Sequence, residues 1–184
     1  MTWELPVTVE VAGKAWPIRS DFRAVLDAIA ALNDAELPAE ARAVACAQIL
    51  YPDWAQLLQQ APDEALAAAM TFVNCGEPVP ENQPPKPQLV RWDKDVQLIA
   101  PAVDAVLGRS CRASAYLHWW EFVGAFDNIG RGLFAQVVAI RSKRIRGQKL
   151  DAAEKRFLRE NPDLIGPKTQ TTPEEEAFFR KLGL

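Results

Sequence analysis

The chain has 184 residues, of which 49% are hydrophobic and 24% are charged, and its formal net charge at pH 7 is −3. These values are typical of a globular protein with one domain, with or without appendages, and they exclude a chain that is disordered throughout. No window approaches eighteen uncharged apolar residues, and the first residues, MTWELPVTVEV, lack a basic segment followed by an apolar run. We therefore expect neither a membrane span nor a signal peptide.

The first predicted element is a β-hairpin within residues 5–18, LPVTVEVAGKAWPI. Three valines alternate with polar residues before a turn at Ala12 and Gly13, and Trp16 and Ile18 lie on the returning strand. One face of this hairpin is apolar. We expect it to be covered, because an isolated hairpin is only marginally stable in water.

After the hairpin the pattern becomes helical and stays so. Apolar residues recur three and four positions apart, which is the spacing of one helix face. Ser20 is the expected cap of the first helix, and Pro38 and Pro62 stand at first-turn positions of the next two. A short turn is expected at residues 54–58, and Gly76 suits the left-handed position that follows the third helix.

Five prolines and almost no apolar residues lie between Gly76 and Pro87, which predicts an extended, solvated linker. We therefore divide the chain into four parts. They are a hairpin with three helices, a proline-rich linker, a second helical portion and an acidic extension with a short helix, at residues 1–76, 77–90, 91–160 and 161–184. The sequence leaves open whether the two helical portions pack together.

The second helical portion opens at Arg91 and Trp92. Pro101 lies inside its first helix and is expected to kink or split it, because proline removes a backbone donor and clashes with the preceding turn. Asp151 and Glu154 form a capping-box pattern before a later helix.

The predicted fold class is mainly α, with an N-terminal β-hairpin followed by a bundle of about seven helices. We expect helices near residues 21–32, 38–50, 62–75, 91–107, 117–126, 132–145 and 154–160, and a short one at 174–182.

The only histidine of the chain, His118, lies in the stretch YLHWWEFVGAF, three residues before Glu121. A His-x-x-Glu pair can bind a metal in a helix bundle, but such sites also use a second histidine, which this chain does not have. We therefore interpret His118 as a packing residue that is hydrogen-bonded or half exposed. We expect no catalytic residue, no metal site and no cofactor.

The cysteines and glycines support the same expectation. Cys46, Cys75 and Cys111 show no CxxC spacing, so we expect three reduced thiols in a cytoplasmic protein. A zinc site would require these three residues and His118 to converge from four separate segments. No serine has a GxSxG context and no glycine-rich loop follows a predicted strand, so the sequence favours a protein that is not an enzyme.

Charge is distributed unevenly along the chain. Residues 1–130 carry −8, residues 131–159 carry +7 and residues 160–184 carry −2, so the molecule can bind an acidic partner or itself end to end. The basic segment RSKRIRGQK includes four residues that we consider candidates for partner binding: Arg141, Lys143, Arg144 and Arg146. They could contact phosphates, but aromatic residues are sparse there and the chain is acidic overall. A solvated helix end or a docking surface for an acidic protein is favoured over a nucleic-acid site.

The order of several segments resembles that of a phage family named for gene product fifteen. These segments are LPVTVEV, AGKAWPIRSDFR, ILYPD, FVNCGEP, a proline-rich break, WDKDVQLI, YLHWWEF and IRSKRI, and they extend over nearly the whole chain. The family occurs in siphophages and prophages, where its gene usually lies between those of the major tail protein and the tape measure protein. The C-terminal TPEEEAFFRKLGL is longer and more acidic than the resemblance leads us to expect.

The resemblance implies a tail morphogenesis factor made in the cytoplasm of the bacterial host, and in particular a tail assembly chaperone. Its expected partners are the tape measure protein and the tail tube protein, or a second copy of itself. A tape measure protein is long and amphipathic, so its apolar stripe must be covered before the tail polymerises around it.

Four aromatic residues are the predicted contacts for such a partner, because helical grooves lined by aromatic rings accept amphipathic helices. They are Trp119, Trp120, Phe122 and Phe126. Adjacent tryptophans point about 100° apart on a helix, so at most one of the two is expected to face a ligand. The alternatives are a structural subunit of the virion tail or neck and, less favoured, a nucleic-acid-binding factor that uses residues 141–159.

Overall fold

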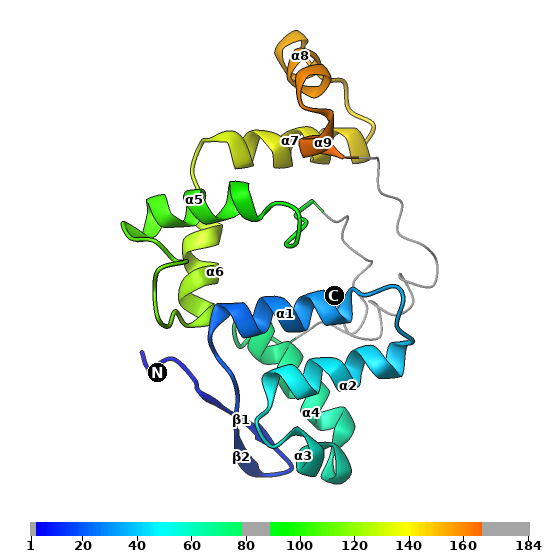
Figure 1. Cartoon of the computed structure of the whole chain (residues 1–184), viewed down its shortest axis with the longest axis vertical. Helices are drawn as coiled ribbons and strands as arrows, with labels where there is room; N and C mark the ends of the chain where they lie inside the picture. Colours follow the sequence, from blue (N-terminus) through cyan, green and yellow to red (C-terminus); the bar gives the residue numbers. More distant parts are fainter. Residues whose placement is uncertain (1–2, 79–88, 167–184) are drawn as a thin grey trace.

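The computed structural model describes residues 3–78 and 89–166, so most of the predicted linker and the helix predicted at 174–182 lie outside the described residues. The elements are, in chain order, β1 (Thr8–Val11), β2 (Lys14–Pro17), α1 (Phe22–Leu32), α2 (Ala39–Leu50), α3 (Trp54–Gln60), α4 (Pro62–Val73), α5 (Val96–Leu107), α6 (Trp119–Asp127), α7 (Leu133–Ile145), α8 (Ala152–Glu160) and α9 (Pro162–Ile165). Figure 1 shows them along one long axis, with the hairpin and α3 at one end and α8 at the other. Each helix in the two described ranges is too short or too polar to cross a bilayer.

The predicted fold class is confirmed, since the described residues form an N-terminal hairpin followed by helices. Two short helices add to the predicted bundle. The chain forms α3 where a turn was expected at residues 54–58, and it forms α9 directly after α8. Leu57 in α3 and Ile165 in α9 are buried, so each short helix is anchored by a buried apolar side chain.

The hairpin pairs β1 and β2 in antiparallel register, with Val9 opposite Trp16. Ala12 and Gly13 both have positive φ, 51° and 71°, which is the turn geometry that matches the twist of a two-residue hairpin. The backbone N–H of Ala12 donates to the Glu64 carboxylate of α4 at 2.9 Å. The covering element that the apolar hairpin face requires is therefore α4.

The cap of α1 differs from the prediction. Asp21, not Ser20, stands at the N-cap and accepts the backbone N–H of Arg23 at 3.0 Å. The Ser20 hydroxyl instead forms a hydrogen bond with the hydroxyl of Tyr116 at 2.8 Å. Both residue types cap helices well, and the long-range contact to Tyr116, which the local pattern cannot show, decides which of the two does so here.

The helix α5 runs without a break across Pro101, so the predicted split is wrong. An interior proline costs a helix about 3 kcal/mol relative to alanine. Ile99, Ala100 and Val103 are buried on either side of it, and burying a Val or Ile side chain contributes about 1.5–3 kcal/mol. Burial of this apolar face therefore outweighs the proline and keeps both halves helical.

The two helical portions share one hydrophobic core, which answers the question that the sequence left open. The rings of Phe22 in α1 and Phe122 in α6 stack with centroids 4.5 Å apart. Next to them the backbones form a short bridge, in which the N–H of Phe22 donates to Leu117 and the N–H of Trp119 donates to Ser20. The bridge and the stacked rings join α1 to α6 across the linker.

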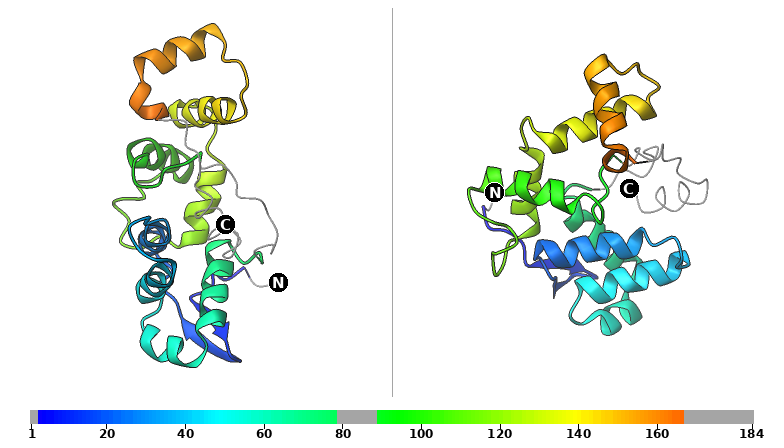
Figure 2. Two further views of the ribbon diagram at one scale, coloured as in Figure 1. Left: turned by 90° about the vertical axis from the view of Figure 1, so that its right-hand side faces the viewer. Right: turned by 45° about the horizontal axis from the view of Figure 1, so that its top comes forward.

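A second, smaller core lies among the last three helices. Its fully buried members are Val137, Ile140 and Ile165, and the partly buried residues packed on them are Leu98, Leu150, Phe157, Leu158 and Leu164. Figure 2 shows α7, α8 and α9 as a layer beyond α5. The helix α8 has no buried residue of its own, so it is the least anchored long helix of the described residues.

Candidate functional site

His118 is a buried packing residue, 1% exposed, and it caps α6 instead of lying within it. Its Nδ1 accepts the backbone N–H of Trp120 at 3.0 Å, so in the neutral ring Nε2 carries the proton and donates to the carbonyl of Pro6 at 2.9 Å. Both ring nitrogens are therefore engaged by the backbone. Glu121, the expected partner in a metal-binding pair, is exposed.

Two of the four predicted aromatic contacts lie inside the core. Trp119 is 3% exposed, and its indole N–H donates to the carbonyl of Val73 at 2.8 Å. Phe122 is 2% exposed and stacks on Phe22 and Trp119. A partner could reach these two rings only if the core opened, so partner binding there stays a prediction.

The other two aromatic residues keep part of their surface exposed. Trp120 donates its indole N–H to the carbonyl of Phe72 at 2.9 Å. The ring of Phe126 lies 4.9 Å from that of Trp92, measured between centroids. Because each ring is partly covered by the core, it could offer only its exposed part to another polypeptide.

The predicted contact residue Arg141 is the centre of a buried network. It is 5% exposed, and its guanidinium forms a bidentate pair with the Asp95 carboxylate at 2.5 and 2.8 Å. Its remaining N–H groups donate to the backbone carbonyls of Leu89, Leu164 and Ile165. All five donors of the guanidinium are used, so in this structure Arg141 joins α7 to the start of α5 and to α9.

Asp95 is shared by two arginines, since Arg91 also donates to it from its backbone N–H at 2.9 Å and from its guanidinium at 3.3 Å. Burial alone would raise the pKa of this carboxyl group. The hydrogen bonds and positive charges of Arg141 and Arg91 outweigh burial and hold the pKa of Asp95 below its ordinary value. One carboxylate thus faces two guanidinium groups.

The other three predicted basic contacts differ in whether they already have a hydrogen-bond partner within the described residues. Lys143 pairs with Glu154 at 2.5 Å, and this hydrogen bond holds the pKa of the Glu154 carboxyl group below its ordinary value. Arg144 donates to the carbonyl of Gly166 at 2.7 Å and is partly exposed. Arg146, just after α7, is exposed. Partner binding at these three residues stays a prediction.

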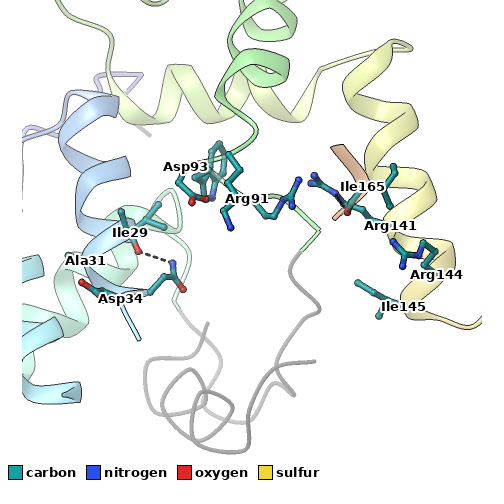
Figure 3. Close-up of a pocket in the computed structure, with 13 residues that line it drawn as sticks. Ile29, Ala31, Asp34, Arg91, Asp93, Arg141, Arg144, Ile145 and Ile165 are labelled. Atoms are coloured by element: carbon teal, nitrogen blue, oxygen red, sulfur yellow. Dashed lines mark hydrogen bonds between the residues drawn. The ribbon is translucent and has the colours of Figure 1, made fainter. Parts of the chain in front are cut away.

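A pocket of about 560 Å³ lies between α1, the segment before α5, and α7 with α9. Its lining residues are Ile29, Ala30, Ala31, Asn33, Asp34, Arg91, Trp92, Asp93, Lys94, Arg141, Arg144, Ile145 and Ile165. Figure 3 shows Arg91 and Arg141 pointing toward one another, with the end of α1 on one side and Arg144 and Ile145 on the other. The volume is within the range of pockets that hold small ligands or a few side chains of a partner.

The cysteines do not form a reactive or metal-binding centre within the described residues. Burial raises the pKa of the Cys46 thiol to about 12, and burial with the nearby Asp104 raises that of Cys111 to about 11. Burial, with a smaller effect of Asp127, also raises the pKa of Cys75. Protonated thiols are poor nucleophiles. In residues 3–78 and 89–166, no cluster of three or more His, Cys, Asp or Glu side chains is placed to hold a metal ion.

The sequence analysis named Arg141 and Arg144, which both line this pocket, but it did not predict the pocket itself. The segment RWDKD contains Arg91, Trp92 and Lys94, and its local sequence pattern predicts the start of a helix. The charge pattern could have drawn attention to Asp95, because an acidic residue that begins an apolar helix near a basic partner is a candidate for a buried pair. The pocket itself arises from four separate segments, at residues 29–34, 91–94, 141–145 and 165, which no local pattern brings together.

Comparison with known proteins gives one family. Residues 1–87 match the model of the family described as Bacteriophage Gp15 protein. The match covers the hairpin and α1 to α4, and it ends before the YLHWWEF and IRSKRI segments. No curated protein and no solved structure matches the chain. The predicted resemblance to the phage gene product fifteen family is thus confirmed, by a match that covers residues 1–87 of this chain.

Proposed function

We propose that the protein is a phage tail morphogenesis factor that works without catalysis, as a tail assembly chaperone that binds the tape measure protein in the cytoplasm of the bacterial host. The observation that carries this proposal is the family match over residues 1–87. The contacts of His118 agree with it, since both of its ring nitrogens are used by the backbone and neither is directed at a substrate.

The shape of the molecule also supports binding to a polypeptide. A pocket of about 560 Å³ with an apolar and charged lining is suited to side chains of a partner chain. Trp120 and Phe126 on α6 each keep part of their surface exposed. A helix-in-groove contact needs only a few such anchors spaced along one face of the bound helix.

The proposal is tested by coexpression in a bacterial host with the tape measure protein of the same phage. The tape measure protein is expected to stay in the supernatant after centrifugation and to copurify on a tag placed on this protein. If the tape measure protein is insoluble and is not retained, while the tagged protein is folded by circular dichroism, the chaperone function is wrong. Detection of the protein in purified virions would favour the structural-subunit alternative.

A nucleic-acid-binding factor remains the second candidate, because several exposed cations gather at the α8 end of the molecule. They are Arg146, Lys149, Lys155, Arg156 and Arg159. Phosphate contacts give binding that falls steeply with salt. Retention of duplex DNA at low salt that is lost at high salt, and lost on charge reversal at Arg156 and Arg159, would support this candidate.

A further inference from the structure

The pocket between α1 and α7 carries an excess of positive charge that its own acidic residues do not balance. Arg91 and Arg141 share the single carboxylate of Asp95. The Nε of Arg91 is buried and has no hydrogen-bond partner among the described residues. Lys94 and Arg144 add two further cations to the lining.

The acidic residues of the lining lie at its α1 side and at its edge. Asp34, in the turn after α1, accepts the backbone N–H of Glu36 at 2.9 Å, so one of its oxygens is already used. Asp93 is exposed. The cations therefore dominate the α7 side of the pocket, where Arg91, Arg141 and Arg144 lie close to Ile165 (Figure 3).

Apolar side chains make up much of the remaining wall. Ile29 comes from α1, Ile145 and Ile165 come from α7 and α9, and Trp92 packs against the aromatic residues of α6. An anionic sugar or a phosphate would leave this apolar surface without a partner. A ligand that carries both a carboxylate and an apolar side chain would use both kinds of wall.

We propose that this pocket binds an acidic amphipathic segment of polypeptide, with an apolar side chain against Ile145 and a carboxylate beside Lys94 and Arg144. The inference rests on the proposed function and deepens it, because it assigns to the pocket one contact with the tape measure protein. Nucleic acid fits less well, since a sugar-phosphate backbone carries no apolar side chain to place against Ile145.

The experiment uses the full-length protein and an array of overlapping peptides from the tape measure protein. The probe variant is Lys94→Glu, because Lys94 is exposed and lines the pocket. The matched control is Lys155→Glu, which makes the same charge change at an exposed position of α8 outside the pocket. Both variants are first shown to unfold at the same urea concentration as the wild type.

The wild type is expected to retain peptides that combine Asp or Glu with large apolar residues. Charge reversal turns attraction into repulsion, so Lys94→Glu should lower the affinity for these peptides at least about tenfold, as measured by fluorescence anisotropy. Lys155→Glu should leave the affinity unchanged. The inference is overturned if Lys94→Glu binds as the wild type does, or if both variants lose binding equally. Retention of only basic or only neutral peptides would overturn it as well.

The two proposals fail in different ways. If the intact tape measure protein copurifies and Lys94→Glu has no effect, the pocket inference is wrong and the chaperone function stands. If the wild type neither retains peptides nor copurifies with the intact partner, both are wrong. If the pocket instead takes a second copy of this chain, the wild type will dimerise at low salt, Lys94→Glu will be monomeric, and no peptide will be retained, which overturns the inference.

Discussion

At the scale of single residues, long-range contacts decide the roles of the polar side chains that lie in the core. His118 is held through its two ring nitrogens by residues of two different segments, Pro6 and Trp120. Arg141 is held through all five donors, and its carboxylate partner Asp95 lies 46 residues away. Buried polar groups with complete sets of hydrogen bonds stabilise one specific arrangement of the chain, which is the role that we assign to both.

Replacement of His118 by alanine is expected to lower the free energy of unfolding by about 3 kcal/mol, because the α6 cap is lost and the carbonyl of Pro6 is left without a donor. His118→Asn should recover about 1 kcal/mol, since asparagine is a good N-cap residue. Urea unfolding followed by circular dichroism measures both values. A folded His118→Asn protein that no longer holds the tape measure protein would contradict the packing role.

Acid is expected to destabilise the protein partly through Asp95. Its pKa is lowered in the folded state, so the contribution of this group is complete above its unfolded pKa of about 3.9 and is lost as pH falls through the lower folded value. Asp95→Asn should cost about 3 kcal/mol near neutral pH, because it leaves Arg141 as a buried charge without its counter-ion.

The measurement for Asp95 is urea unfolding from pH 7 down to about pH 3, the range that spans the ordinary carboxyl pKa. The loss of stability below about pH 4 should be smaller in Asp95→Asn than in the wild type. Asp93→Asn is the control, since Asp93 is exposed two residues away. Equal pH profiles for the wild type and Asp95→Asn would show that the buried pair does not control acid stability.

At the scale of elements, much of the fold was predictable from local signals. Apolar periodicity placed most of the long helices within about two residues of their observed bounds, and the capping box at Asp151 and Glu154 is present as expected. The predicted start of α5 at Arg91 is wrong, because the helix begins at Val96. The misses share one physical cause, which is tertiary contact. The choice of Asp21 over Ser20 as cap depends on Tyr116, and the continuity of α5 depends on buried neighbours. The burial of Arg141 depends on Asp95, so a segment that reads as a solvated basic end is partly interior.

The proline inside α5 allows a prediction about the stability of this helix. Pro101 is exposed and the helix is already continuous around it. Pro101→Ala is therefore expected to raise the free energy of unfolding, by about 1–3 kcal/mol, since alanine adds a backbone donor and removes the clash of the ring with the preceding turn. Thermal unfolding should show a higher midpoint. An unchanged or lower midpoint would mean that α5 needs the proline geometry.

At the scale of the whole molecule, charge is separated along the long axis. The helices α2, α3 and α4 carry an excess of exposed carboxylates, whereas α7 and α8 carry an excess of cations. Figure 1 shows these two groups of helices at opposite ends of the molecule. The pocket lies between them, where cations and apolar side chains meet. The uneven charge was visible in the sequence, but the position of the pocket was not, because the folded chain places the end of α1 and α7 on opposite sides of the same cavity.

The complex with the tape measure protein is expected to weaken with salt, because charged groups contribute to the proposed contact. The Debye length falls to about 3 Å at 1 M salt, which screens ion pairs at the opening of the pocket but not the apolar contacts. In a pull-down at increasing NaCl, the amount of tape measure protein that is retained should fall in part. The fall should be smaller for Lys94→Glu than for the wild type. Retention that does not depend on salt would contradict the electrostatic part of the account.

The central claim is that this protein holds another polypeptide and keeps it from aggregating. The most direct measurement is size-exclusion chromatography with light scattering on the coexpressed pair. The account predicts one soluble species whose mass equals a defined number of copies of both chains. A folded, separate peak of this protein beside an aggregated tape measure protein would contradict it.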